Sequence, residues 1–153
     1  MLGTLNRDEI DHALRTEVVG RIGGHDDGRT YIVPITYAYD GGHVYGHSAV
    51  GMKVRMMRTN PHVCFEVDHM EDMANWQSVI AWGVYEELHG DAATEAMRLL
   101  IDRLAPLMAS ETSQPSHGLG APSGHRADTA GHEAVIYRIT PTEKTGRFER
   151  NRA

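Results

Sequence analysis

Residues 46–53 are Gly46-His47-Ser48-Ala49-Val50-Gly51-Met52-Lys53, and they connect two segments of different character. The apolar pair Val44-Tyr45 before them is typical of the end of a strand. The residues after them can form a helix that ends near Asn60, because the proline at position 61 disfavours the helical conformation of the residue before it. Backbone N–H groups at a helix start, together with a lysine, can bind a phosphate group. We therefore expect a strand-to-helix turn that binds phosphate.

Two other interpretations use the same glycines. A nucleoside-triphosphate P-loop has four residues between its glycines, followed directly by Lys and then Ser or Thr. Gly46 and Gly51 have this spacing, but Met52 comes before Lys53, and Val54 occupies the position of the magnesium-binding hydroxyl. These departures exclude a P-loop. A turn whose glycines only allow unusual backbone angles, beside a solvated lysine, stays open as an alternative.

Length, charge and cysteine content narrow the class of protein. A chain of 153 residues is expected to form a single domain, residues 1–153, with its own core. The net charge of −6 argues against nucleic-acid binding, which needs a basic face, and the absence of an apolar run of about 18 residues argues against a membrane span. The single cysteine, Cys64, cannot form an internal disulfide, and the N-terminus lacks the pattern of a secretory signal. We therefore expect a cytoplasmic protein.

Hydrophobic periodicity predicts strands for most of the chain. Strands are expected over residues 16–24, 30–39, 43–47, 62–69 and 76–88, and two closing strands over 133–140 and 144–150. Pro34 indicates an edge, a bulge or a split in the second of these, and Gly83 a bend in the fifth. Helices are expected over residues 6–15, with Asn6 and Glu9 forming a capping box, and after Asp91 as a cap. Short connections predict a mainly β (α+β) fold, an antiparallel barrel with flanking helices.

The order and spacing of several motifs resemble the FMN-binding split β-barrel family related to pyridoxamine 5′-phosphate oxidase. The central motifs are Val44-Tyr45-Gly46-His47-Ser48, Gly51-x-Lys53, Asn60-Pro61 and Val63-x-Phe65. The flanking motifs are most similar to the branch of nitroimidazole-resistance-type proteins; they are Val33-Pro34-Ile35-x-Tyr37, Asn75-Trp76-x-Ser78-Val79-x-x-x-Gly83 and Thr145-Gly146-Arg147. Together they extend over most of the chain.

The resemblance implies a homodimer with FMN at the subunit interface. In such proteins the lysine after the turn contacts the phosphate, the polar residues that end the preceding strand contact the cofactor, and the flavin ring lies against the strand that contains the proline. A polar residue early in the long strand also reaches the flavin. With Gly51 at the helix start and Trp76 as a wall of the pocket, the expected cofactor-binding residues are Val33, Pro34, Ile35, Thr36, His47, Ser48, Gly51, Lys53, Trp76 and Ser78.

The chain departs from the oxidases of this family at two places. Met52 occupies the position of an arginine that precedes the phosphate-binding lysine, and an arginine fork grips phosphate strongly. The oxidases' substrate-phosphate residues have no recognisable counterpart, which argues against pyridoxamine phosphate oxidation. The expected function is therefore that of an FMN-dependent oxidoreductase acting on a small molecule such as a nitroaromatic, with the flavin supplying the redox chemistry and no catalytic residue assigned.

Several alternatives stay open. His117, His125 and His132 share the segment 109–132 and could line a substrate entrance or ligate haem or a metal, although no spacing typical of a metal site occurs. A haem-binding split barrel and a flavin-binding module without turnover are therefore the competing functions. Trp76 could instead only pack against the sheet, and His47 could make only a structural hydrogen bond.

Overall fold

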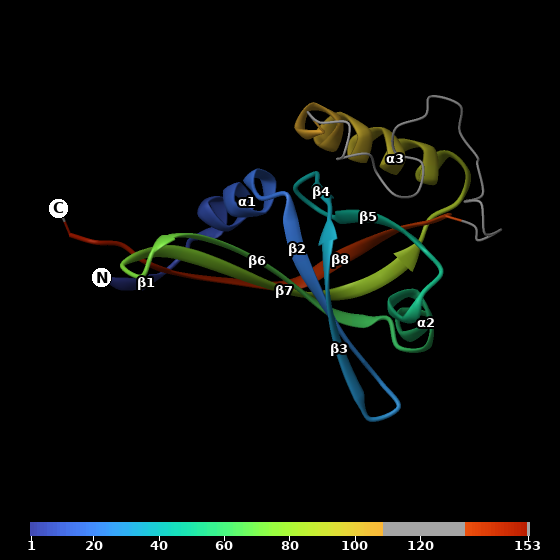
Figure 1. Ribbon diagram of the computed structural model, residues 1–153, viewed down its shortest axis with the longest axis horizontal. Coiled ribbons are helices and arrows are strands. Elements are labelled where there is room, and N and C mark those ends of the chain that lie inside the picture. Colours follow the sequence, from blue (N-terminus) through green and yellow to red (C-terminus); the bar gives the residue numbers. More distant parts are fainter. Residues whose placement is uncertain (109–133, 153) are drawn as a thin grey trace.

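The computed structural model describes residues 1–108 and 134–152 (Figure 1). The helices of these residues are α1 (Arg7–Thr16), α2 (Met52–Thr59), α3 (Gly90–Leu104) and the short 3-10 helix η1 (Ala105–Leu107). The strands are β1 (Leu2–Thr4), β2 (Val19–Asp26), β3 (Arg29–Thr36), β4 (Ala38–Tyr39), β5 (Val44–Ala49), β6 (His62–Asp72), β7 (Asn75–Glu87) and β8 (Ala134–Glu149). The fold is mainly β, as predicted.

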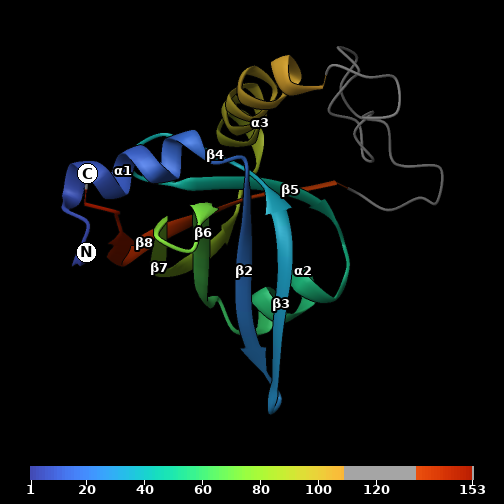
Figure 2. The same ribbon diagram turned by 60° about the vertical axis from the view of Figure 1, so that its left-hand side comes forward.

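The strands form one antiparallel sheet that curls into a split barrel. Their order is β3-β2-β6-β7-β8-β5-β4, with β1 paired to β8. β3 pairs only with β2, and β5 pairs with β4 only at Val44 and Tyr45. Within the described residues, β3 and the end of β5 therefore each keep one edge without a strand partner, so the barrel stays split. Figure 2 shows α1 and α3 on one side of this barrel and α2 on the other.

The two ends of the barrel carry different parts of the chain. Leu2 and Trp76 both pair with Glu149, so the N-terminus, the C-terminal part of β8 and the β6–β7 turn lie at one end. The helix α2 and the tip of the β2–β3 hairpin lie at the other end (Figure 1). The β2–β3 hairpin extends past its neighbour, because β2 pairs with β6 only at residues 21–23.

Local sequence signals placed several boundaries correctly. The side chain of Asn6 accepts a hydrogen bond from the Glu9 N–H, and the Glu9 side chain accepts one from the Asn6 N–H, which completes the predicted capping box. The helix α2 ends at Thr59, before Asn60, as the following proline requires. The β7–β8 register shifts between Trp82 and Gly83, where a bend was expected.

Three predictions of local structure were wrong in detail. The strand expected over 30–39 is interrupted at Tyr37, whereas Pro34 lies in the edge strand β3, which confirms the edge among the alternatives predicted for it. The N-cap of α3 is His89, so Asp91 lies within the first turn, where its charge suits the helix dipole. The two closing strands are one strand, β8, because Pro141 pairs with Gly83 at the register shift and β7 pairs along both halves.

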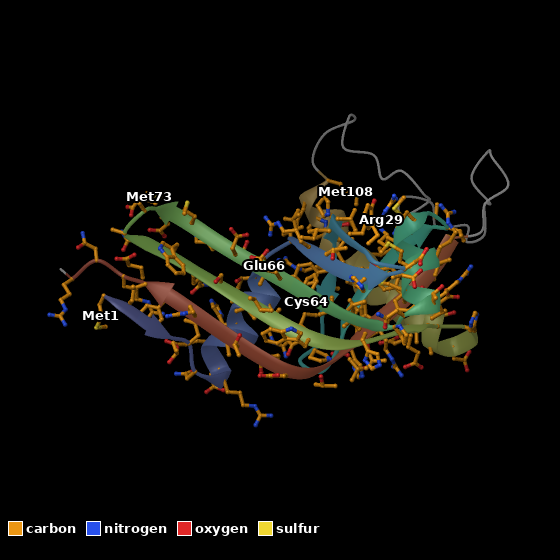
Figure 3. The ribbon with its side chains drawn as sticks, turned by 90° about the horizontal axis from the view of Figure 1, so that it is seen from below. Met1, Arg29, Cys64, Glu66, Met73 and Met108 are labelled. Carbon is orange, nitrogen blue, oxygen red and sulfur yellow. The ribbon has the colours of Figure 1, made fainter. Side chains whose placement is uncertain are left out.

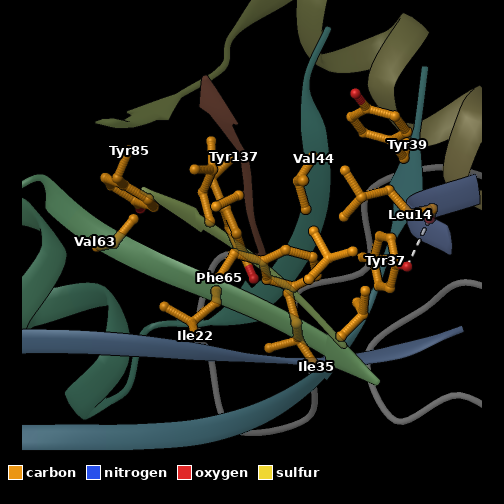
Figure 4. Packing of buried hydrophobic residues seen from close by; sticks show 14 of the residues in the cluster. Leu14, Ile22, Ile35, Tyr37, Tyr39, Val44, Val63, Phe65, Tyr85 and Tyr137 are labelled. Carbon is orange, nitrogen blue, oxygen red and sulfur yellow. Dashed lines mark hydrogen bonds between the residues drawn. The ribbon is translucent and has the colours of Figure 1, made fainter. Parts of the chain in front are cut away.

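The main core fills the barrel interior. Phe65 lies at its centre with no exposed surface, and Tyr37 packs edge-on against it with ring centroids 4.9 Å apart. The Tyr37 hydroxyl donates a hydrogen bond of 2.6 Å to the carbonyl oxygen of Leu14, which fixes α1 to the barrel (Figure 4). A second cluster, with Leu100 and Leu104, joins α3 to β4 and β5. No helix in residues 1–108 and 134–152 is long and apolar enough to span a lipid bilayer.

Candidate functional site

The start of α2 is an electropositive helix end without a side-chain cap. Gly51 is the N-cap residue, and it has no side chain that could accept a hydrogen bond from the first turn. The first turn contains no acidic residue, whereas α1 begins with Asp8, Glu9 and the Asn6 cap. The first N–H groups of a helix have no acceptor within it, and the helix dipole adds partial positive charge there. These groups can therefore donate hydrogen bonds to an anion.

Lys53 adds a full positive charge to this helix end. Its side chain is half-buried, and burial lowers its pKa because it removes the ammonium group from water. The described residues supply neither an ion pair nor a hydrogen bond to Lys53. A partly buried cation that lacks a counter-charge is costly for the protein alone, and an anionic ligand would offset that cost.

A small pocket lies beside Lys53, between α2 and the β2–β3 hairpin. Met56 and Met57 belong to the same helical face as Lys53, since they follow it at i+3 and i+4. The opposite wall comes from β2 and β3, and the complete lining is Ile22, Gly24, Tyr31, Val33, Lys53, Met56 and Met57. Sequence reasoning identified only Val33 and Lys53 here. The helical spacing of Met56 and Met57 was the signal that could have added them.

The two glycines of the central turn have different environments. A Cβ atom at Gly46 would collide with the Tyr137 hydroxyl group, so Gly46 is needed for packing. A Cβ atom at Gly51 would have no other atom within 4 Å, and the backbone there is extended, so Gly51 borders open space. The Tyr137 hydroxyl is fully buried and has no hydrogen-bond partner in the described residues. Gly51 therefore leaves open space beside the first N–H groups of α2.

His47 and Ser48 occupy opposite faces of β5, because side chains alternate along a strand. Ser48 shares the face of the buried Val44, and its hydroxyl donates a hydrogen bond of 2.7 Å to the Ala49 carbonyl oxygen. His47 shares the face of Tyr45, which packs in the cluster beneath α3. The structure therefore brings Ser48, but not the His47 side chain, to the face of β5 that lines the barrel interior.

The four predicted residues of β3 differ in exposure. Val33 lines the pocket beside Lys53, and Ile35 is buried in the main core. Pro34 and Thr36 are exposed on the opposite face of the same strand. The backbone groups of Ile35 point toward Gly20 of β2, whereas those of Thr36 and the carbonyl group of Pro34 face the free edge of β3.

Trp76 and Ser78 do not join this group within one chain. Both lie on the outer face, defined as the side of β2, β6, β7 and β8 that carries Arg21, Glu66, Ser78 and Arg147. Lys53 packs beside inward-facing side chains of β2 and β3. Two strands, β2 and β6, separate β7 from β3, which corresponds to about 14 Å at the usual strand spacing. Figure 3 shows Met73 at the β6–β7 turn and Arg29 on the β2–β3 hairpin toward opposite ends of the molecule.

A salt-bridged cluster occupies the outer face between these strands. Arg21 Nη1 lies 3.2 Å from Glu66 Oε2 and 2.8 Å from Asp68 Oδ1. Burial and the neighbouring Asp68 raise the pKa of Glu66. The remaining apolar side chains on this face include Ile32, which is 68% exposed, and Trp82, which is 41% exposed. This face therefore combines exposed apolar side chains with an internally paired charge cluster.

The predicted histidine site cannot be located. His117, His125 and His132 lie outside the described residues. Within residues 1–108 and 134–152, no three His, Cys, Asp or Glu side chains gather as metal ligands would.

Comparison with known proteins agrees with this architecture. The family model for pyridoxamine 5′-phosphate oxidase matches residues 6–148. An FAD-binding protein from Mesorhizobium loti has a similar crystal structure, with 28% sequence identity, a TM-score of 0.72, and coverage of 99% of this chain and 98% of that one. A candidate 5-nitroimidazole antibiotic resistance protein from Bacteroides thetaiotaomicron shares the fold, with a TM-score of 0.65, 19% identity, and coverage of 97% of this chain and 89% of that one.

A relative found by sequence matches part of this chain. An uncharacterized protein from Rhizobium meliloti is 34% identical over 84 residues, which is 55% of this chain. The match spans 56% of that relative, so just over half of its length is covered.

Proposed function

The chain belongs to the pyridoxamine 5′-phosphate oxidase family, and on that basis we propose that it is a flavin-binding oxidoreductase that holds FMN at the start of α2. The observation that carries the proposal is the uncapped helix end beside Lys53, a half-buried cation with no partner in the described residues. The FAD-binding protein from Mesorhizobium loti supports a flavin as the ligand. Bound FMN would supply the redox chemistry, and the protein binds and orients it.

Different groups near α2 would bind different parts of the cofactor. The α2 N–H groups and Lys53 would hold the phosphate group, and the space in front of Gly51 would admit it. The free edge of β3 offers the carbonyl group of Pro34 and the backbone groups of Thr36 to the polar edge of the ring, because Val33 and Ile35 direct theirs toward β2. Met52 is exposed where a second cation would strengthen phosphate binding, so Lys53 bears most of the charge complementarity in this chain.

We propose a homodimer as the functional form. Trp76 and Ser78 lie on the face opposite Lys53 and about three strand spacings from β3. They can contact the same flavin only if they come from a second copy. The exposed Ile32 and Trp82 on the outer face support this arrangement, since dimer formation would remove them from water.

The substrate would be a small molecule such as a nitroaromatic. The open edge of the barrel next to β3 leaves one side of the proposed ring position free for such a molecule. The described part of the chain contains no dinucleotide-binding helix of the Rossmann type, so a nicotinamide electron donor would bind only transiently.

The absorption spectrum of the purified protein tests the flavin, and released cofactor distinguishes FMN from FAD by chromatography. We expect the paired near-ultraviolet and blue bands of a flavin. A Soret band would support the haem-binding alternative. Rapid mixing with NADH or NADPH, followed by a nitroaromatic, tests turnover. A flavin that is reduced but passes electrons to no acceptor would support the non-catalytic alternative, and a flavin-loaded monomer in light scattering would contradict the dimer.

A further inference from the structure

The helix α2 is tied to the sheet at its C-terminal end. The Arg58 guanidinium group donates two hydrogen bonds to the Glu87 carboxylate at the end of β7, of 2.5 Å from Nε and 3.3 Å from Nη2. Glu87 Oε1 also accepts a hydrogen bond of 2.9 Å from the hydroxyl group of Tyr85, which is buried in the main core. The side chain of Asn60, the C-cap of α2, donates a hydrogen bond of 2.8 Å to the carbonyl oxygen of His25 in β2. The end of α2 is therefore joined to both β7 and β2.

The start of α2, which would hold the phosphate group of the flavin, lacks such a connection. Gly51 borders open space, and residues 1–108 and 134–152 supply neither a side-chain cap for the first turn nor an ion pair for Lys53. Between the two ends of the helix, Val54 is fully buried in the core. Apolar burial is non-directional, so it sets the depth of the helix more than its position along the sheet. The bidentate pair of Arg58 and Glu87 has a defined geometry and supplies that direction.

We propose that Glu87 is a positioning residue for the phosphate site. Through Arg58 it holds α2 where the N–H groups of the first turn and Lys53 meet the phosphate of FMN. This inference rests on the proposed function, since it concerns the same phosphate. Arg58 lies about 10 Å along the helix from Gly51, so Glu87 acts on the phosphate through the helix and not by contact.

The sign of the effect separates this role from simple electrostatics. The negative charge of Glu87 repels an anionic ligand, so its removal alone should strengthen FMN binding. If Glu87 positions α2, Glu87→Ala should instead weaken FMN binding by about three- to tenfold, the lower range of coupling between residues of one hydrogen-bond network. Riboflavin, which has no phosphate group, should bind with unchanged affinity.

Titration of the apoprotein with FMN and with riboflavin tests the proposal. The preference for FMN over riboflavin should fall in Glu87→Ala, in Arg58→Ala and in the double variant, because each of them breaks the same connection. The double variant has the net charge of the wild type, so a wild-type preference there would show that charge alone matters and would overturn the proposal. Glu86→Ala is the matched control, since this neighbouring carboxylate pairs with Arg138 of β8, and it should not lower the preference.

A second comparison covers the case in which Glu87→Ala does not fold, because that variant leaves the Tyr85 hydroxyl without its acceptor. Arg58→Ala keeps the bond between Tyr85 and Glu87. Its loss of preference for FMN should exceed that of Arg55→Ala, which removes an exposed cation closer to the start of the same helix. An equal or smaller loss in Arg58→Ala would refute the positioning role. Circular dichroism of each variant reports whether it is folded.

The failure of this inference differs from the failure of the proposed function. Wild-type protein that prefers FMN, together with a folded Glu87→Ala variant of equal or stronger preference, would refute the inference and leave the flavin-binding function standing. Equal weakening of FMN and riboflavin binding in that variant would also refute it, because the effect would then not involve the phosphate. Wild-type protein that binds no flavin would refute both.

Discussion

Replacing Lys53 with alanine is the most direct perturbation of the proposed phosphate site. The substitution removes the amino group of Lys53, whose pKa is lowered by burial, while α2 keeps its N–H groups. Because Lys53 has no ion pair among residues 1–108 and 134–152, the variant breaks no contact between charged groups of the protein. The effect of Lys53→Ala on flavin affinity therefore reports the ligand contact and not a general loss of structure.

The magnitude follows from the kind of bond. A hydrogen bond to a charged group contributes about 1.5–3 kcal/mol, so the dissociation constant of FMN should rise by about 10- to 150-fold. The same loss of charge that weakens FMN binding should make the apoprotein more stable. Lys53→Met, which keeps the apolar stem and removes the buried charge, should raise the free energy of unfolding of the apoprotein.

The pH dependence has a definite sign. Burial lowers the pKa of Lys53 below its ordinary value of 10.5, so the apoprotein loses this proton at a lower pH than the unfolded chain does. A bound phosphate favours the protonated amine. Affinity for FMN should therefore fall as pH rises through the lowered pKa toward 10.5, and Lys53→Ala should abolish that decline.

Quenching of flavin fluorescence on titration of apoprotein measures these affinities. Arg55→Ala is the matched control, because it removes one cation from the exposed face of the same helix. We expect Arg55→Ala to change affinity by less than about 0.5 kcal/mol, as for most surface charges. Equal effects of the two variants would show that long-range electrostatics, and not a contact with Lys53, controls binding. Unchanged affinity in Lys53→Ala would remove the residue from the site.

Three further predictions concern the proposed site and the packing of α1 against the barrel. Gly51→Ala should weaken FMN binding by narrowing the phosphate space; it should lower the thermal midpoint only slightly, because its Cβ would meet no atom within 4 Å and alanine is merely a poorer N-cap than glycine. Gly146→Ala should destabilise the fold by about 1–3 kcal/mol, since its Cβ would lie 2.8 Å from Leu5. Equal midpoints for both variants would contradict this packing. Burial alone would raise the pKa of Asp11, but hydrogen bonds from Lys144 and Tyr39 hold that pKa below 3.8. The ionised carboxylate therefore stabilises the fold at pH values above its ordinary pKa, and this stabilisation is lost as pH falls through the lowered pKa. Asp11→Asn should therefore cost about 1 kcal/mol in urea unfolding at neutral pH, and the difference from wild type should shrink in acid.

The sequence by itself determined the features that depend on neighbouring residues. The capping box of Asn6 and Glu9 needs only residues three apart, and the proline after Asn60 ends α2 through a local steric clash. The uncapped start of α2, with Gly51 and Lys53, could be predicted for the same reason. These contacts are made within one turn of the chain, so no tertiary information was needed to find them.

Tertiary structure decided the features that depend on pairing between distant strands. Pairing with β7 keeps β8 in one piece through Pro141, and packing with Phe65 places Tyr37 at the break between β3 and β4. Strand order set Trp76 and Ser78 apart from Lys53, although all three were predicted to meet one ligand. It also placed Arg147 beside Ser78, 69 positions earlier in the chain. Residues so far apart in sequence meet only through the sheet register, which periodicity along a single strand does not specify.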